Sequence, residues 1–204
     1  MLIPISKEKT RAGITNHRNL HVWATENPHV IRETTFQTQF SINVWAGMID
    51  DELIGPFVLP NRLDQHAFLD FIVNTLPLLL EEVPLETRRR MYLQLDGAPA
   101  HFARLVRDYL NQNYPWRIGR GGAIAWPPRS PDLTPLDFYL WGYMKQKVYA
   151  VPFESREQLT ARIFAAAAEI KENREELRRT IKSVAMRALV CLQEGGGHFE
   201  NLIN

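Results

Sequence analysis

A short acidic turn between two strand-like segments is the feature that most limits the folds open to this chain. Residues 39–49, QFSINVWAGMI, alternate in polarity and contain β-branched side chains, and residues 53–60, LIGPFVLP, follow the acidic triplet DDE. Alternation with a period of two is typical of a strand with one buried face. So short a turn joins antiparallel strands. The sequence therefore predicts a β-hairpin early in the chain.

Helices and short strands alternate after this hairpin. Apolar residues at helical spacing predict a helix over residues 64–83. Pro77 is expected to kink this helix or to end its first half. A short strand follows at 91–95, then an amphipathic helix at 101–114 and a second short strand within residues 121–128, GGAIAWPP. This order predicts a mixed α/β architecture.

The C-terminal third of the chain is helical in pattern. One helix is expected over residues 134–149, with Thr134 as its N-cap and Pro135 at its first position. Two more are expected between residues 155 and 192, before the glycine-rich stop EGGG. We expect these last helices to cover one face of the sheet.

Length and composition are those of an ordinary globular domain. The chain has 204 residues, of which 45% are hydrophobic and 23% charged, and its formal net charge is +1. Overall charge therefore does not demand a nucleic-acid partner, although local basic patches remain. The single cysteine, Cys191, excludes an internal disulfide and fits a reducing compartment. No apolar run reaches the roughly 18 residues that a membrane span needs, so no membrane partner is expected.

Two aspartates stand at the ends of predicted elements where a metal site would form. Asp96 ends the strand at 91–95, and Asp137 begins the helix at 134–149. The residues between them contain a helix and a strand, and such a crossover returns the chain beside its starting strand. Both carboxylates would then meet at the carboxyl edge of the sheet, where α/β proteins bind ligands. Carboxylates gathered there suit Mg²⁺ or Mn²⁺.

Each of these residues also has a purely structural interpretation. Asp96 begins a DG dipeptide, which forms turns readily. Asp137 lies where an acidic side chain favours a helix N-terminus. Asp132, in the proline-bracketed turn SPDLTP, is an alternative second ligand. His101 is a candidate to support a ligand, to contact a phosphate, or simply to begin a helix.

Three motifs carry a family resemblance. VWAGMI, LQLDGAPAH and WPPRSPDLTPLDFYLWGYMK occur in this order and together resemble the catalytic domain of mariner-like transposases, within the DDE superfamily of endonucleases. The resemblance runs from about Gly13 to the C-terminus. It implies an RNase H-like fold, a mixed sheet flanked by helices, over residues 1–204 as a single domain. It also implies Mg²⁺- or Mn²⁺-dependent cleavage and joining of DNA strands, DNA as a partner, dimers and a nuclear location.

The resemblance assigns roles by position. Asp96 matches the second catalytic acid and Asp137 the third, whereas Asp132 matches a motif residue that is not a metal ligand. The first catalytic aspartate has no counterpart in MLIPISKEKT, where Ile5 falls at about the expected place and Glu8 is the only nearby acid. We therefore expect impaired catalysis. The chain also begins without the helix-turn-helix region that the family uses to recognise DNA.

Basic residues supply the candidate nucleic-acid contacts. His101, Arg120 and Arg129 are predicted to bind DNA. Arg117 is a further possible contact with the DNA backbone, and the run Arg88–Arg90 is either another such contact or a solvated loop. Three hypotheses follow for the whole chain. It is a catalytically impaired transposase derivative, an active nuclease that uses a substitute ligand such as Glu8, or a non-enzymatic DNA- or protein-binding scaffold.

Overall fold

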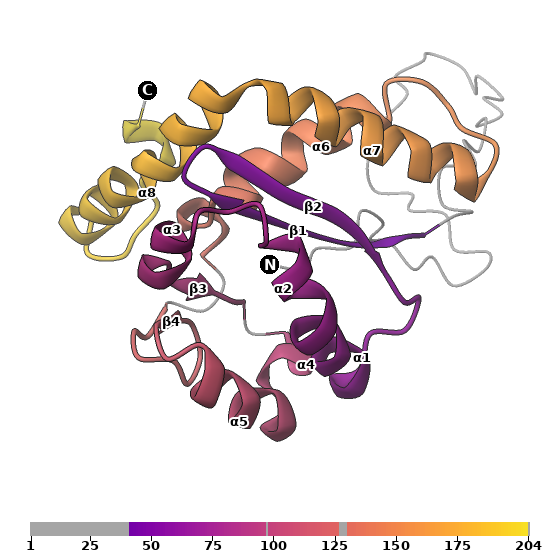
Figure 1. The fold of residues 1–204 in the computed structure, drawn as a ribbon. Coiled ribbons are helices and arrows are strands. Elements are labelled where there is room, and N and C mark those ends of the chain that lie inside the picture. The colour runs from indigo at the N-terminus through magenta and orange to yellow at the C-terminus, as the bar shows by residue number, and fades with distance from the viewer. Residues whose placement is uncertain (1–40, 97, 127–129, 204) are drawn as a thin grey trace, which may run out of the picture.

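A long antiparallel hairpin runs through the middle of the molecule (Figure 1). The computed structural model describes residues 41–96, 98–126 and 130–203. The predicted hairpin is confirmed as β1 (Asn43–Ile49) and β2 (Glu52–Leu59). The register shifts between Trp45 and Gly47, where β2 carries the extra residue. That residue belongs to the pair Gly55–Pro56, in which proline has no N–H to donate to a ladder, so a bulge is the expected result.

The acidic tip of the hairpin is fixed to the last long helix, α8 (Arg174–Gln193). Arg178 Nη2 lies 2.6 Å from Asp51 Oδ2, and Arg174 Nη1 lies 3.9 Å from the same oxygen. Asp50 adopts a positive φ of 50° at the turn. The acidic triplet therefore does more than form a turn, because it joins the hairpin to α8.

The helix predicted over residues 64–83 has three parts. They are α1 (Gln65–Asp70), the π-helical turn η2 (Phe71–Thr75) and α2 (Leu76–Leu79). Asp64 caps α1 by accepting hydrogen bonds of 3.0 Å from the amides of His66 and Ala67. Pro77 does not end the helix. The turn before it is instead widened, with the Leu76 amide donating to Phe71 O.

A parallel pair of short strands follows. The chain passes through α3 (Leu85–Arg90), β3 (Leu93–Gln94), α4 (Pro99–Phe102), α5 (Arg104–Asn113) and β4 (Arg117–Ile118). Strands β3 and β4 pair in parallel, as the predicted crossover requires. The arginine run forms the last turn of α3, so its interpretation as a loop is wrong.

Two details of this region differ from the sequence prediction. The helix expected over 101–114 is split, because Ala103 adopts ψ 146° between α4 and α5. The strand expected within 121–128 is reduced, over its described residues, to one bridge between Ile124 and Ile118. The paired strand lies earlier, at β4, where Leu93 pairs with the buried Arg117 and Gln94 with Ile118.

The proline-rich motif leads into the C-terminal helices. A 3-10 turn η3 (Pro131–Leu133) precedes the π-helical turn η4 (Leu136–Leu140), which continues directly into α6 (Trp141–Val148). The predicted N-cap role of the Thr134 side chain is wrong. Its hydroxyl donates to Ser130 O at 3.0 Å, and its backbone carbonyl accepts from the Asp137 amide at 2.8 Å.

The last two long helices cover the hairpin, as predicted. Helices α7 (Arg156–Glu172) and α8 both contact β2, and α8 also contacts β1. The EGGG stop is confirmed, because the Gly196 amide donates to Cys191 O at 2.8 Å and Gly195 and Gly196 have positive φ. A short 3-10 turn η5 (Glu200–Leu202) ends the described chain. Every helix in the described ranges is too short or too polar to cross a bilayer.

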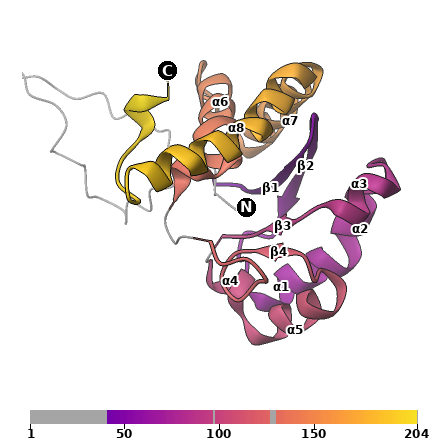
Figure 2. The ribbon, with the colours of Figure 1, turned by 90° about the vertical axis from the view of Figure 1, so that its left-hand side faces the viewer.

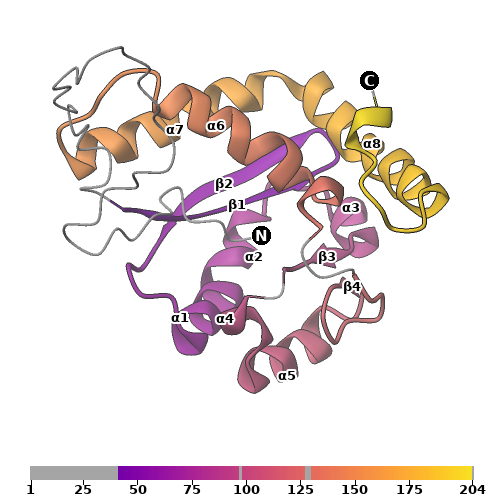
Figure 3. The ribbon, with the colours of Figure 1, turned by 180° about the vertical axis from the view of Figure 1, so that it is seen from behind.

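The hairpin separates two hydrophobic cores. Val44 and Ala46 pack with residues of α6, α7 and α8, whereas Trp45 packs with residues of α1, η2 and α5. Figures 1, 2 and 3 agree in placing α6–α8 on one side of the hairpin and α1, α2, α4 and α5 on the other. The alternation seen in the sequence therefore directs successive side chains of β1 into different cores.

The expected mixed architecture is present, but its strands form two separate ladders. Within the described residues, β1 pairs with β2 and β3 pairs with β4, and no hydrogen bonds join one pair to the other. The antiparallel and parallel parts of the predicted sheet are thus both observed, on either side of a large cavity.

Candidate active site

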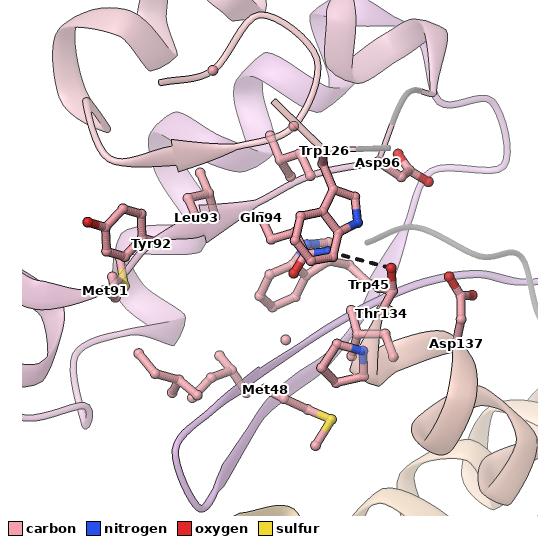
Figure 4. Close-up of a pocket in the computed structure, with 18 of the residues that line it drawn as sticks. Trp45, Met48, Met91, Tyr92, Leu93, Gln94, Asp96, Trp126, Thr134 and Asp137 are labelled. Carbon is pink, nitrogen blue, oxygen red and sulfur yellow. Dashed lines mark hydrogen bonds between the residues drawn. The ribbon is translucent and has the colours of Figure 1, made fainter. Parts of the chain in front are cut away.

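A cavity of about 1480 Å³ lies between the hairpin and the β3–β4 pair. Its walls include Trp45 and Met48 from β1 and Leu93 from β3. Both predicted catalytic acids, Asp96 and Asp137, line it as well. Figure 4 shows the two carboxylates at the same end of this cavity. The structure therefore brings together the two acids that the crossover argument paired.

Asp96 follows β3 and is held in one orientation. Its Oδ1 atom lies 2.6 Å from His101 Nδ1 and accepts a 3.1 Å hydrogen bond from the Ala98 amide. Burial raises the pKa of this carboxyl, but the bond and the charge of His101, together with the Ala98 amide, outweigh burial and lower the pKa below 3.8. Asp96 is therefore ionised at neutral pH. Among the described residues, its Oδ2 atom has no hydrogen-bond partner and is free to bind a cation.

His101 is enclosed by the protein. Its side chain is 1% exposed and its ring lies 4.2 Å from the ring of Phe68, measured between centroids. Its Nδ1 atom contacts Asp96, and its buried Nε2 atom has no partner among the described residues. Such a ring is not accessible to a phosphate. Of the roles that the sequence left open, support of Asp96 fits this geometry and direct contact with DNA does not.

Asp137 lies in the first turn of η4. This element packs in the core that contains α6–α8, whereas Asp96 follows β3, which packs in the other core. Burial, and to a smaller extent the nearby negative charge of Asp96, raise its pKa to about 6 in spite of the opposing positive charge of Lys145. No described residue donates a hydrogen bond to its carboxylate. The fold thus keeps a half-buried carboxylate close to a second one, and no described residue forms an ion pair with it.

Polar and aromatic groups lie next to the two acids. Gln94 Nε2 donates to Thr134 Oγ1 at 3.5 Å, which links β3 to the segment before η4. The indole of Trp126 lies beside these groups (Figure 4), and its Nε1 atom is buried without a partner among the described residues. Trp126 is also a residue that the sequence marks as able to stack on bases, whereas no pattern in the sequence points to Gln94 beyond its closeness to Asp96.

The donor set fits a divalent cation in kind. Carboxylate oxygens are the ligands that Mg²⁺ and Mn²⁺ prefer, and Asp96 Oδ2 and both oxygens of Asp137 are available. The set is small, because the described residues contain no group of three or more His, Cys, Asp or Glu side chains placed to hold a metal ion. Ile5, at the position expected for the first acid, and Glu8 lie outside the described residues.

The remaining predicted site residues divide between the cavity and its surroundings. Arg120 is exposed and lines the cavity, as expected of a nucleic-acid contact. Arg129 lies outside the described residues. Asp132 is in η3 and does not line the cavity, and its backbone carbonyl accepts a 2.9 Å hydrogen bond from Arg187. The geometry therefore favours Asp137 over Asp132 as the partner of Asp96.

Comparison with known proteins finds similarity to transposases. No protein-family model matches the chain. The transposase of the transposable element Tcb1 from Caenorhabditis briggsae is 25% identical over 127 residues, which cover 62% of this chain and 42% of that protein. This chain therefore spans less than half the length of the curated relative that it matches.

Solved structures show the same fold. The catalytic domain of the Mos1 mariner transposase superposes with a TM-score of 0.64 at 25% identity, covering 78% of this chain and 76% of that one. That domain has also been solved with raltegravir and Mn. The Mos1 mariner paired-end complex with Mn gives a TM-score of 0.66 and covers 98% of this chain and 55% of that one, at 20% identity. The expected RNase H-like fold is confirmed.

Proposed function

We propose that this chain, related in sequence and fold to the mariner-like transposase catalytic domain, is a transposase-derived DNA-binding domain with impaired strand cleavage. One observation carries the proposal. Asp96 and Asp137, which come from opposite sides of the hairpin, line one cavity and interact electrostatically. The Mos1 relatives solved with Mg or Mn, and in paired-end and strand-transfer complexes, support the same assignment.

The chain's own residues would prepare a site for a phosphodiester. Asp96 is ionised and presents its free Oδ2 atom to the cavity, while His101 and the Ala98 amide fix its other oxygen. Asp137 supplies a second carboxylate from the start of η4. Asp96 and Asp137 are the residues that would hold Mg²⁺ or Mn²⁺, which would supply an activated water and charge neutralisation at the phosphate.

Impairment follows from the sequence before the described residues. The segment MLIPISKEKT has Ile5 where the first acid is expected, so the proposed site has two of three acids. Loss of one carboxylate weakens the binding of at least one ion in a two-metal site. We extend the proposal to a single domain over residues 1–204, to DNA as partner, to dimers and to a nuclear location.

Nicking of supercoiled plasmid DNA in Mn²⁺ tests the proposal. The unmodified chain should leave the plasmid intact, whereas Ile5→Asp should create nicking activity. Adding Asp96→Asn or Asp137→Asn to Ile5→Asp should abolish that gain, because each removes a required ligand. Asp132→Asn in the same background is the matched control and should leave nicking unchanged, because Asp132 does not line the cavity.

The outcomes separate the hypotheses. Strong nicking by the unmodified chain that disappears in Asp96→Asn would contradict impairment. If Glu8→Gln also abolished it, the chain would be an active nuclease with a substitute ligand. Failure of Ile5→Asp to nick, together with DNA binding that needs no metal, would favour the scaffold. Arg107 and Arg120, which both stack on the ring of Phe102 and of which Arg120 lines the same cavity as Asp96, are the observation that supports this second function.

A further inference from the structure

We infer that the glycine-rich loop Gly119–Gly122, with Arg107 and Arg120, is a binding site for a phosphate group of a DNA strand, next to Asp96. The inference rests on the proposed function and deepens it, since it assigns the element that would hold the substrate backbone. The loop joins the end of β4 to the bridge at Ile124. Neither the family resemblance nor the comparisons assign a role to it.

The loop has a conformation that only glycine allows. Gly119 and Gly121 have φ values of +141° and +71°. A Cβ atom on Gly119 would lie 2.6 Å from Leu95 O, and one on Gly122 would lie 2.7 Å from Arg117 O. The loop therefore passes directly over the backbone that precedes Asp96, a closeness that any side chain would prevent.

The loop leaves two amides available. Gly119 N donates to Ile124 O at 3.0 Å and Gly122 N donates to Gly119 O at 3.1 Å. The amides of Arg120 and Gly121 have no partner among the described residues. Successive free amides in a tight turn at the carboxyl end of a strand form a concave donor surface that suits anions.

The loop is held in place by a buried arginine. Arg117 is 6% exposed, and its Nη2 atom donates to Asn111 Oδ1 at 2.6 Å and to Gly121 O at 2.9 Å. These bonds connect the loop to α5. The donor surface is therefore rigid before any ligand arrives, which lowers the entropic cost of binding.

Positive charge converges on the same place. The guanidinium carbons of Arg120 and Arg107 lie 3.9 and 4.5 Å from the centre of the Phe102 ring. Burial lowers the pKa of Arg117, and the positive charge of Arg107 lowers it further. None of the three is in an ion pair within the described residues, although Arg104 on the same helix pairs with Asp108 at 3.7 Å.

Three unpaired guanidinium groups are an unfavourable arrangement unless an anion neutralises them. Arg120 and Arg107 both stack on Phe102, and Arg120 is exposed and lines the cavity, so its guanidinium is the group available to a phosphate there, while Arg107 adds positive charge behind the loop. Arg120 and the loop glycines line the same cavity as Asp96 and Asp137. A phosphate bound there would place the adjoining phosphodiester beside the carboxylates.

Binding of a short fluorescent DNA duplex, measured by anisotropy over a range of salt concentrations, tests the site. Arg120→Ala and Arg107→Gln should each weaken binding about tenfold at about 0.1 M salt and reduce the slope of log K against log salt by about 1. Arg120→Lys keeps the charge and should retain the slope. Arg104→Ala is the matched control and should bind as the unmodified chain does.

A second measurement separates this inference from the proposed function. In ¹⁵N-resolved NMR spectra, titration with inorganic phosphate should shift the amides of Arg120 and Gly121 more than chloride does at equal ionic strength. Those shifts without duplex binding would refute the proposed function and leave the phosphate site standing. Duplex binding that is equally strong in Arg120→Ala, Arg107→Gln and Arg104→Ala would overturn the inference, as would the absence of phosphate-specific shifts.

Discussion

Replacing Asp137 by asparagine should make the protein more stable at neutral pH. Burial and the charge of Asp96 raise the pKa of Asp137 from 3.8 to about 6, so the folded state disfavours its ionised form. Each tenfold change in acidity corresponds to about 1.4 kcal/mol, which would give about 3 kcal/mol. Solvent screening at this half-buried side chain reduces the cost to about 1–1.5 kcal/mol. Asparagine removes that cost without changing the size of the side chain.

The effect has a defined dependence on pH. Between pH 3.8 and about 6 the folded protein binds more protons at Asp137 than the unfolded chain does, so stability falls as pH rises through this window. Above it the cost of the ionised form is fully present, and below it the cost disappears. The gain from Asp137→Asn should therefore appear at pH 7.5 as an increase in Tm of about 3–5 °C and vanish near pH 3.5.

Thermal unfolding followed by circular dichroism, in metal-free buffer at both pH values, measures this gain. Asp132→Asn serves as the control and should leave Tm unchanged. An Asp137→Asn protein that is no more stable at pH 7.5, or that gains equally at both pH values, would refute the reasoning. The carboxylate would then be relieved by a partner that the electrostatic argument does not include.

Three further perturbations test the supporting structure. His101→Ala should lower the free energy of unfolding by about 2–3 kcal/mol in guanidinium denaturation, because it removes a buried ring and a hydrogen bond to a charged group; a loss below about 0.5 kcal/mol would contradict the support of Asp96. Gly119→Ala should cost about 1–3 kcal/mol, whereas Gly142→Ala, in α6 with open space around it, should stabilise by about 0.5–1 kcal/mol in the same assay. Arg178→Ala should cost about 1 kcal/mol at low salt and less at high salt in urea, and an effect independent of salt would exclude its ion pair with Asp51.

Patterns of long range in the sequence predicted the fold well. The hairpin, the parallel crossover and the two C-terminal helices follow from periodicity and turn residues, which act over many positions at once. The closeness of Asp96 and Asp137 follows from the crossover between them, which returns the chain beside its starting strand. This prediction requires only the order of the elements. These features were accessible because each depends on a repeated or topological signal.

Local details depended on tertiary contacts that no short pattern carries. The break at Ala103 has no glycine or proline of its own, and β4 begins at Arg117, a residue type rarely buried. Its burial depends on Asn111 and on the Gly121 carbonyl, which only the folded chain brings close. The widened turn before Pro77 could likewise not be predicted from the sequence, because a proline there is compatible both with a kink and with the end of the first half of the helix.

Because the hairpin separates two cores, the two carboxylates are attached to different parts of the molecule. Asp96 is anchored in one core through β3 and His101, and Asp137 in the other through η4 and α6. The distance between the two carboxylates therefore depends on how the two cores are positioned across β1. A cation bound by both acids would link the two cores. Substitutions in β1 far from either acid would then change the affinity for the cation without touching a ligand.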